Sequence, residues 1–141
     1  MITQGLVTSF KQQILVATHN FTATTGDAFY IALYDSSATL NSDTTVYTTS
    51  GEITGTGYTA GGALLTSITP TTSGSTAMGS FAAITWSTAT FTAGGALIYN
   101  STQGNKAVAV LSFGNDKTVS GIDFVVTFPT MASTTAIIRF P

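Results

Sequence analysis

The sequence predicts an all-β fold: a jelly-roll-like sandwich of two sheets, built from about eight strands with a short N-terminal helix. Three observations favour this class. Threonine makes up roughly a fifth of the 141 residues, and its branched side chain suits a pleated surface that faces water. Charged residues are only 7% of the chain, well below the content of an ordinary soluble domain. Several runs of strand length are apolar on both faces, so each needs cover from a second sheet or from a partner.

The chain length predicts one domain over residues 1–141, with an N-terminal helix or arm in residues 1–20 and the β-sandwich in residues 27–141. The helix is expected from residue 3 to about residue 17, because one side of this segment is apolar at helical spacing. The residues of that side are Leu6, Val7, Phe10, Ile14 and Leu15. Thr3 is the candidate N-cap. We favour a helix that closes one end of the β-core; the alternative is an arm that docks on a neighbouring subunit.

A central hairpin is predicted over residues 93–113. Two apolar runs flank the polar loop Asn100–Asn105, in which Gly104 can take a positive φ. The second arm is apolar on both faces, which is typical of a strand covered on both sides. Further strands are expected over residues 27–34, 80–86, 121–128 and 136–140, with turn clusters over 69–76 and 115–117.

Residues 35–50 are rich in serine, threonine, aspartate and asparagine, with few apolar side chains. A loop of this length inside a domain is usually functional, or becomes ordered on contact with a partner. We therefore expect it to be the most variable surface of the protein.

A short repeat links two parts of the chain. Thr59–Leu65 reads TAGGALL and Thr92–Ile98 reads TAGGALI, each directly after an aromatic residue. The glycine pair predicts a bulge or bend where a strand curves around the sandwich. We interpret the match as a shared local geometry rather than as a duplication.

The sequence offers little chemistry, and we expect no enzymatic activity, no cofactor and no metal site. The one histidine, His19, cannot build a multi-imidazole zinc site, and no Gly-x-Ser-x-Gly motif accompanies it. The absence of cysteine excludes thiolate chemistry. The carboxylates are scattered singly. Residues 41–43 alternate oxygen-bearing side chains, but the spacing of a calcium loop is absent.

Composition also argues against two kinds of partner. The formal net charge is -2, with only four lysine and arginine residues, so no basic surface is expected to bind nucleic acid. No apolar run approaches the ~20 residues that cross a bilayer, and the N-terminus lacks the pattern of a signal peptide. We therefore expect no membrane association.

Two blocks of the sequence resemble the cementing (decoration) proteins on the heads of tailed phages. One block joins Thr8–Gln13 to Asp27–Tyr34, and the other joins Phe91–Asn100 to Asn105–Gly114. The resemblance implies a jelly-roll decoration protein on the outer surface of the virion. Such a protein would act as a homodimer that binds the major capsid protein and cements neighbouring capsid subunits together. The resemblance supplies no individual contact residues.

The main alternative function is a tail or fibre module that binds the host surface, and a third is an enzyme that acts on cell-wall sugars. A carbohydrate-binding protein would instead use exposed tyrosines as stacking platforms; the candidates are Tyr30, Tyr34, Tyr47, Tyr58 and Tyr99. For docking on a capsid we expect the helix and the 35–50 loop to form the interface. Its candidate residues are Leu6, Phe10, Leu40, Val46 and Tyr47.

Overall fold

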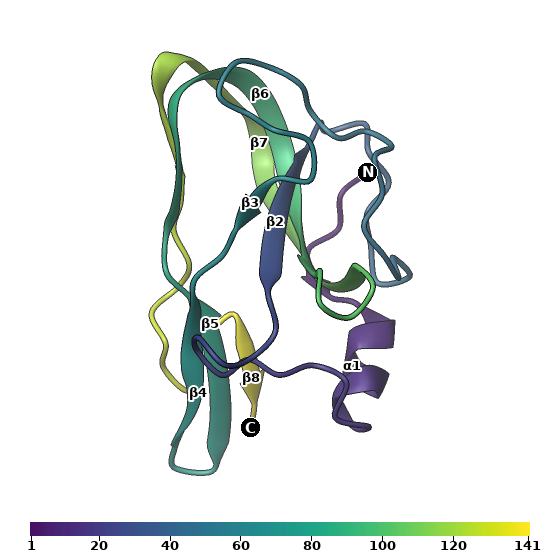
Figure 1. Ribbon diagram of the computed structural model, residues 1–141, viewed down its shortest axis with the longest axis vertical. Coiled ribbons are helices and arrows are strands. Elements are labelled where there is room, and N and C mark those ends of the chain that lie inside the picture. Colours follow the sequence, from purple (N-terminus) through teal and green to yellow (C-terminus); the bar gives the residue numbers. More distant parts are fainter.

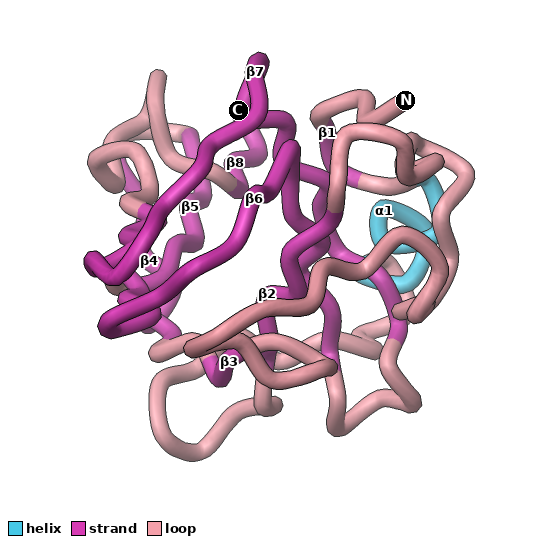
Figure 2. The backbone as a smooth tube through the Cα atoms, turned by 90° about the horizontal axis from the view of Figure 1, so that it is seen from above, coloured by secondary structure: helices cyan, strands magenta, loops and turns pink.

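The computed structural model describes all residues 1–141 and confirms the predicted class, with two antiparallel sheets and one short helix. The elements are β1 (Gly5–Leu6), α1 (Thr8–Ile14), β2 (Phe29–Tyr34), β3 (Ala63–Leu64), β4 (Ser67–Ser73), β5 (Thr76–Phe81), β6 (Ile84–Asn100), β7 (Lys106–Val126) and β8 (Ile138–Phe140). The larger sheet has the strand order β1-β7-β6-β2-β3, and the smaller sheet has the order β4-β5-β8. Seen from above in Figure 2, α1 lies at one side of the molecule and β4 and β5 at the other.

The predicted central hairpin is confirmed, and it is longer than expected. Its arms are β6, with 17 residues, and β7, with 21 residues. Gly104 and Asn105 take left-handed backbone angles in the connecting turn, with φ of 69° and 60°. In Figure 1 the two strands bend together over the top of the molecule, so that one half of the hairpin lies beside β2 and the other half descends toward β4 and β5.

The second glycine pair of the repeat lies at this bend, as predicted. The register between β6 and β7 shifts between Ala93 and Gly95. A Cβ atom on Gly94 would lie 2.8 Å from the Cα atom of Ser36, and one on Gly95 would lie 2.5 Å from the carbonyl oxygen of Leu111. Glycine is therefore needed here for close approach of the backbone.

The core is one continuous apolar cluster enclosed by the bent hairpin, β2 and the loops. Trp86 is 5% exposed, and its ring centroid lies 5.9 Å from that of Phe124. At the other end Phe21 stacks on Phe29 with ring centroids 4.4 Å apart. The strand β2 is buried at five of its six positions, which agrees with the prediction that both of its faces are covered.

The helix is shorter than the periodicity predicts. It begins at Thr8 because Gly5 and Leu6 pair with β7 and extend the larger sheet. Thr3 does not cap it; the backbone N–H of Thr3 donates to the carbonyl oxygen of Leu40 instead, and the N-cap position holds Val7 without a side-chain cap. Sheet pairing therefore overrides a weak helical pattern at the N-terminus.

The strand predicted over 80–86 is two strands in the structure. The strand β5 ends at Phe81 and β6 begins at Ile84, so the chain crosses from the smaller sheet to the larger one at residues 82–83. Both Phe81 and Trp86 are buried, because each faces the core from its own sheet. The alternating pattern therefore ran across a sheet boundary.

The turn predicted over 69–76 is confirmed only at residues 74–75, and the turn predicted at 115–117 is strand. Residues 67–73 form the edge strand β4, where Pro70 sits at a register shift between Ile68 and Thr71. An edge strand tolerates proline because one row of its N–H groups has no partner strand. Residues 115–117 lie inside β7, where Lys117 pairs with Ala93. The polar residues there follow from the exposed position of this half of the hairpin.

Candidate docking surface

The predicted interface residues do not form one surface. Phe10 and Leu40 have no exposed area, so neither can contact a partner in this conformation. Leu6 is half-buried in β1, whereas Val46, 48% exposed, and the half-buried Tyr47 belong to the loop. The prediction is therefore wrong for Phe10 and Leu40. The helix packs Phe10 into the core, and the N-terminal residues form backbone hydrogen bonds with Leu40.

The 35–50 loop has no helix or strand, yet it is fastened to the body. The N–H of Asp35 donates to the carbonyl oxygen of Gly51 at 2.9 Å, and the N–H of Tyr47 donates to that of Asn105 at 2.9 Å. The Tyr34 hydroxyl donates to the carbonyl oxygen of Thr48 at 2.6 Å. These bonds define the loop conformation without any partner.

Four tyrosines gather around Glu52 and the fifth, Tyr30, stacks on one of them, an arrangement that no spacing in the sequence indicates; we call it the tyrosine cluster. The Glu52 carboxylate accepts hydrogen bonds from the hydroxyls of Tyr47 and Tyr58, both at 2.6 Å. It also accepts one from the N–H of Gly61 at 2.7 Å. The members of the cluster are Tyr30, Tyr34, Tyr47, Tyr58, Tyr99 and Glu52.

The tyrosine side chains contact one another and the backbone, which leaves few free ring faces for a ligand. Tyr99 stacks with both Tyr47 and Tyr30, with ring centroids 4.8 and 5.8 Å away, so these rings cover part of one another's faces. Burial, with the nearby Glu52 carboxylate, raises the pKa of Tyr99 to about 12. A sugar-stacking platform needs free ring faces, so this geometry does not favour the carbohydrate-binding reading.

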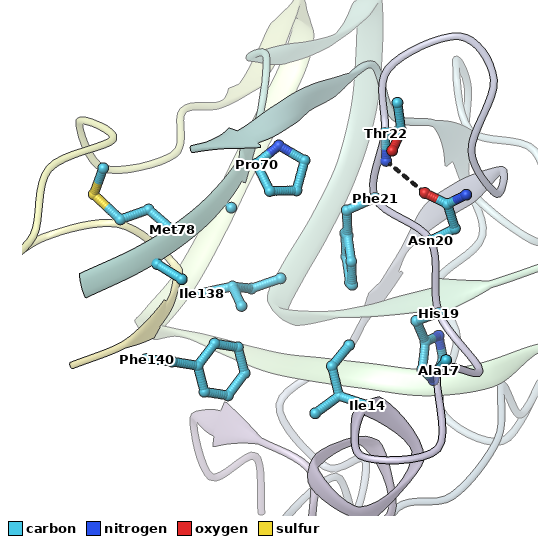
Figure 3. A pocket seen from close by; sticks show the side chains of 12 residues that line it. Ile14, Ala17, His19, Asn20, Phe21, Thr22, Pro70, Met78, Ile138 and Phe140 are labelled. Atoms are coloured by element: carbon cyan, nitrogen blue, oxygen red, sulfur yellow. Dashed lines mark hydrogen bonds between the residues drawn. The ribbon is translucent and has the colours of Figure 1, made fainter. Parts of the chain in front are cut away.

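An apolar cleft of about 430 Å³ lies between the end of α1, the segment that follows it and the smaller sheet; we call it the docking cleft. No charged residue lines it. Figure 3 shows Ile14 and Phe21 facing Ile138 and Phe140 across it, with Pro70 and Met78 on the far wall. Pockets of this size and character suit apolar groups of a partner.

Three exposed apolar side chains line the docking cleft or directly follow one of its lining residues in the chain; we call them the rim. Leu15 and Val16, directly after the lining residue Ile14, are 83% and 63% exposed. Phe140 lines the cleft and is 41% exposed. Helical spacing placed Leu15 on the buried side, but α1 ends at Ile14 and the next residues turn outward. Adjoining exposed apolar side chains of this kind mark interaction sites.

One wall of the docking cleft is fixed by a buried polar network around His19, which is 7% exposed. The ring Nε2 lies 2.8 Å from Gln13 Oε1, and Nδ1 lies 2.9 Å from Asn100 Nδ2. Asn100 Nδ2 also donates to Asp27 Oδ2 at 2.7 Å, and the backbone N–H of Gln103 donates to Asn100 Oδ1 at 3.2 Å. The network therefore ties the cleft wall to the turn of the central hairpin.

Nowhere in the chain do three or more His, Asp or Glu side chains gather closely enough to hold a metal ion. None of the helical structure is long and apolar enough to cross a membrane. Comparisons with family models, with curated protein sequences and with solved structures find no match to this chain. The functional proposal therefore depends on the surface features and on the sequence resemblance.

Proposed function

We propose that this protein is a structural virion protein that binds the outside of an assembled phage capsid and cements neighbouring major capsid subunits. The observation that carries the proposal is the docking cleft, because its uncharged lining and exposed rim suit burial against another protein. The low charge content agrees with a chain that works while docked. The resemblance to phage decoration proteins supports the choice of partner.

The mechanism is mass action. A protein that binds only the assembled shell stabilises that shell by an amount set by its concentration relative to its dissociation constant. Many copies, each burying roughly 1,200–2,000 Å², would reinforce the shell against internal pressure. A homodimer, as the resemblance implies, would let one unit bridge two capsid subunits through equivalent surfaces.

The function is tested with phage particles that lack the protein. We expect such particles to lose heat or osmotic resistance, and purified protein added back to restore it. Equal resistance with and without the protein would exclude a cementing role.

The docking cleft is tested separately with two double variants of similar exposure. Leu15→Ser with Val16→Ser removes the rim, and Ile122→Ser with Val125→Ser removes residues of β7 that are 60% and 53% exposed and lie outside the cleft. We expect the rim variant to bind particles more than about tenfold more weakly than the native protein, and the β7 variant to bind normally. Equal binding by both variants would show that another surface docks.

The alternative is a tail or fibre module that binds the host surface. Labelling the protein in intact particles for electron microscopy separates the two functions, because dozens of copies over the head exclude a tail role. Label confined to the tail would replace the cementing proposal by the alternative.

A further inference from the structure

The hydrogen-bond network fixes which nitrogen of His19 carries the proton. The amide of Asn100 cannot be turned round, because its oxygen would then face the Asp27 carboxylate and its nitrogen would face the N–H of Gln103. Asn100 therefore presents an N–H to His19 Nδ1, which must accept. The proton of the neutral ring is on Nε2, where it is donated to Gln13.

A second proton on the ring has no place in this arrangement. It would have to bind Nδ1, where it would meet one N–H of the Asn100 amide, whose other N–H is donated to Asp27 at 2.7 Å. Asn100 is fully buried, so water cannot relieve two donors that face each other. Protonation of His19 therefore costs the network at least one hydrogen bond.

The charges around the ring are few. Asp27 precedes β2 and favours a charged ring, whereas Lys106, at the start of β7, opposes it. Lys11 of α1 is exposed, Arg139 of β8 lines a different groove, and β4 and β5 carry no titratable side chain. Burial is the largest effect and lowers the pKa of His19 below its ordinary value of about 6.5.

The segment held by His19 is strained. Ala17 and Thr24 take left-handed backbone angles, with φ of 58° and 64°, which non-glycine residues rarely adopt. The segment gains its shape from its contacts: Phe21 packs on Phe29, and the N–H of Ala23 donates to Thr69 Oγ1 at 3.0 Å. Loss of the His19 bonds therefore weakens a segment that already stores strain.

We propose that His19 is a pH-responsive latch: the segment from Leu15 to Ala28 is held in place as one wall of the docking cleft while the ring is neutral, and it is released when the ring takes up a proton. When the segment is open, the His19 ring has the ordinary histidine pKa. When the segment is closed, the hydrogen-bond network disfavours protonation of the ring. Lowering the pH below about 6.5 therefore favours opening, and the effect levels off below the pKa of the closed state. The link to docking rests on the proposed function, but the latch itself is a property of the isolated protein.

The first test is nuclear magnetic resonance of the ring, which is unambiguous because His19 is the only histidine. We expect the neutral Nε2–H form at pH 7 and titration below the ordinary histidine value. A ring that is protonated on Nδ1 at pH 7, or that titrates at or above the ordinary value, would overturn the proposal.

The second test is amide hydrogen exchange of the native protein, expressed as protection factors so that the intrinsic effect of pH cancels. We expect protection in residues 20–28 to fall below pH 6.5, by at most about tenfold per pH unit, while the amides of β6 and β7 keep theirs. Unchanged protection, or an equal loss throughout β6 and β7, would contradict a local latch. His19→Gln, which cannot be protonated, should remove the pH dependence, although the native comparison decides the matter if this variant does not fold. These outcomes do not depend on whether the protein binds a capsid.

Discussion

Ala63 and Ile98, one from each copy of the repeat, pair with the same residue of β2, Ile31, from opposite sides. Gly61 and Gly62 of the first copy have left-handed backbones in a turn, with φ of 92° and 80°, whereas the second glycine pair lies inside β6. The interpretation of the repeat as one shared local geometry is therefore wrong. The two copies share a neighbour and differ in conformation.

The first glycine pair gives a matched test of close packing. A Cβ atom on Gly62 would lie 1.9 Å from the carbonyl oxygen of Ile31, whereas one on Gly61 meets only the Tyr99 hydroxyl at 3.5 Å. Both positions are left-handed, so alanine costs about 1 kcal/mol at either from the backbone alone. We expect Gly62→Ala to cost more than about 3 kcal/mol in unfolding free energy, or to prevent folding. Urea unfolding followed by the fluorescence of Trp86 measures both, and similar costs for the two variants would rule out the steric explanation.

The carboxylate of Glu52 is expected to stabilise the loops it joins. In Glu52→Gln one acceptor oxygen becomes an amide donor, so the Tyr47 hydroxyl or the N–H of Gly61 loses its partner. We predict a loss of about 2 kcal/mol in unfolding free energy. Asp43→Asn is the control, because Asp43 is exposed on the 35–50 loop and its change should stay within about 0.5 kcal/mol. An equally small effect at Glu52 would mean that the tyrosine cluster does not contribute to stability.

Alkaline pH should unfold the protein through the same cluster. Burial raises the pKa of Tyr34, Tyr47, Tyr58 and Tyr99, the last to about 12. The folded state favours the neutral phenols. The contribution of these tyrosines to the stability of the fold is therefore complete below the ordinary tyrosine pKa of about 10 and is lost as the pH rises above it. We expect most tyrosinate absorbance to appear together with the change in Trp86 fluorescence. Ionisation of two or more tyrosines while the fluorescence stays native would contradict the buried cluster.

Local patterns predicted the elements that are apolar and continuous. The strand that contains Phe29–Tyr34 and the turn with Gly104 follow from alternation and turn chemistry alone. Patterns misled where tertiary pairing decides: Gly5 and Leu6 join a sheet instead of the helix, and Pro70 is accepted at an edge strand. Neither choice is visible without the partner strand.

The surface features were harder to predict because they combine distant segments. The tyrosine cluster joins Tyr58 to Tyr99 through pairing on both sides of β2, and no window of sequence contains both. The docking cleft likewise needs the end of α1 beside Phe140, near the other end of the chain. The exposure of Leu15 follows from the early end of the helix, which a hydrophobic pattern alone does not mark.

The pairing of β1 with the middle of β7 has a consequence for biosynthesis. Gly5 finds its partner, Val110, only after most of the chain has been made, and β2 likewise waits for the end of β6. The long hairpin can form from neighbouring residues, whereas the first third of the polypeptide must leave the ribosome without its partners. Phe10 and Phe29 are then exposed to solvent until the last strands emerge, so the nascent N-terminal region is where chaperone contact or aggregation should begin.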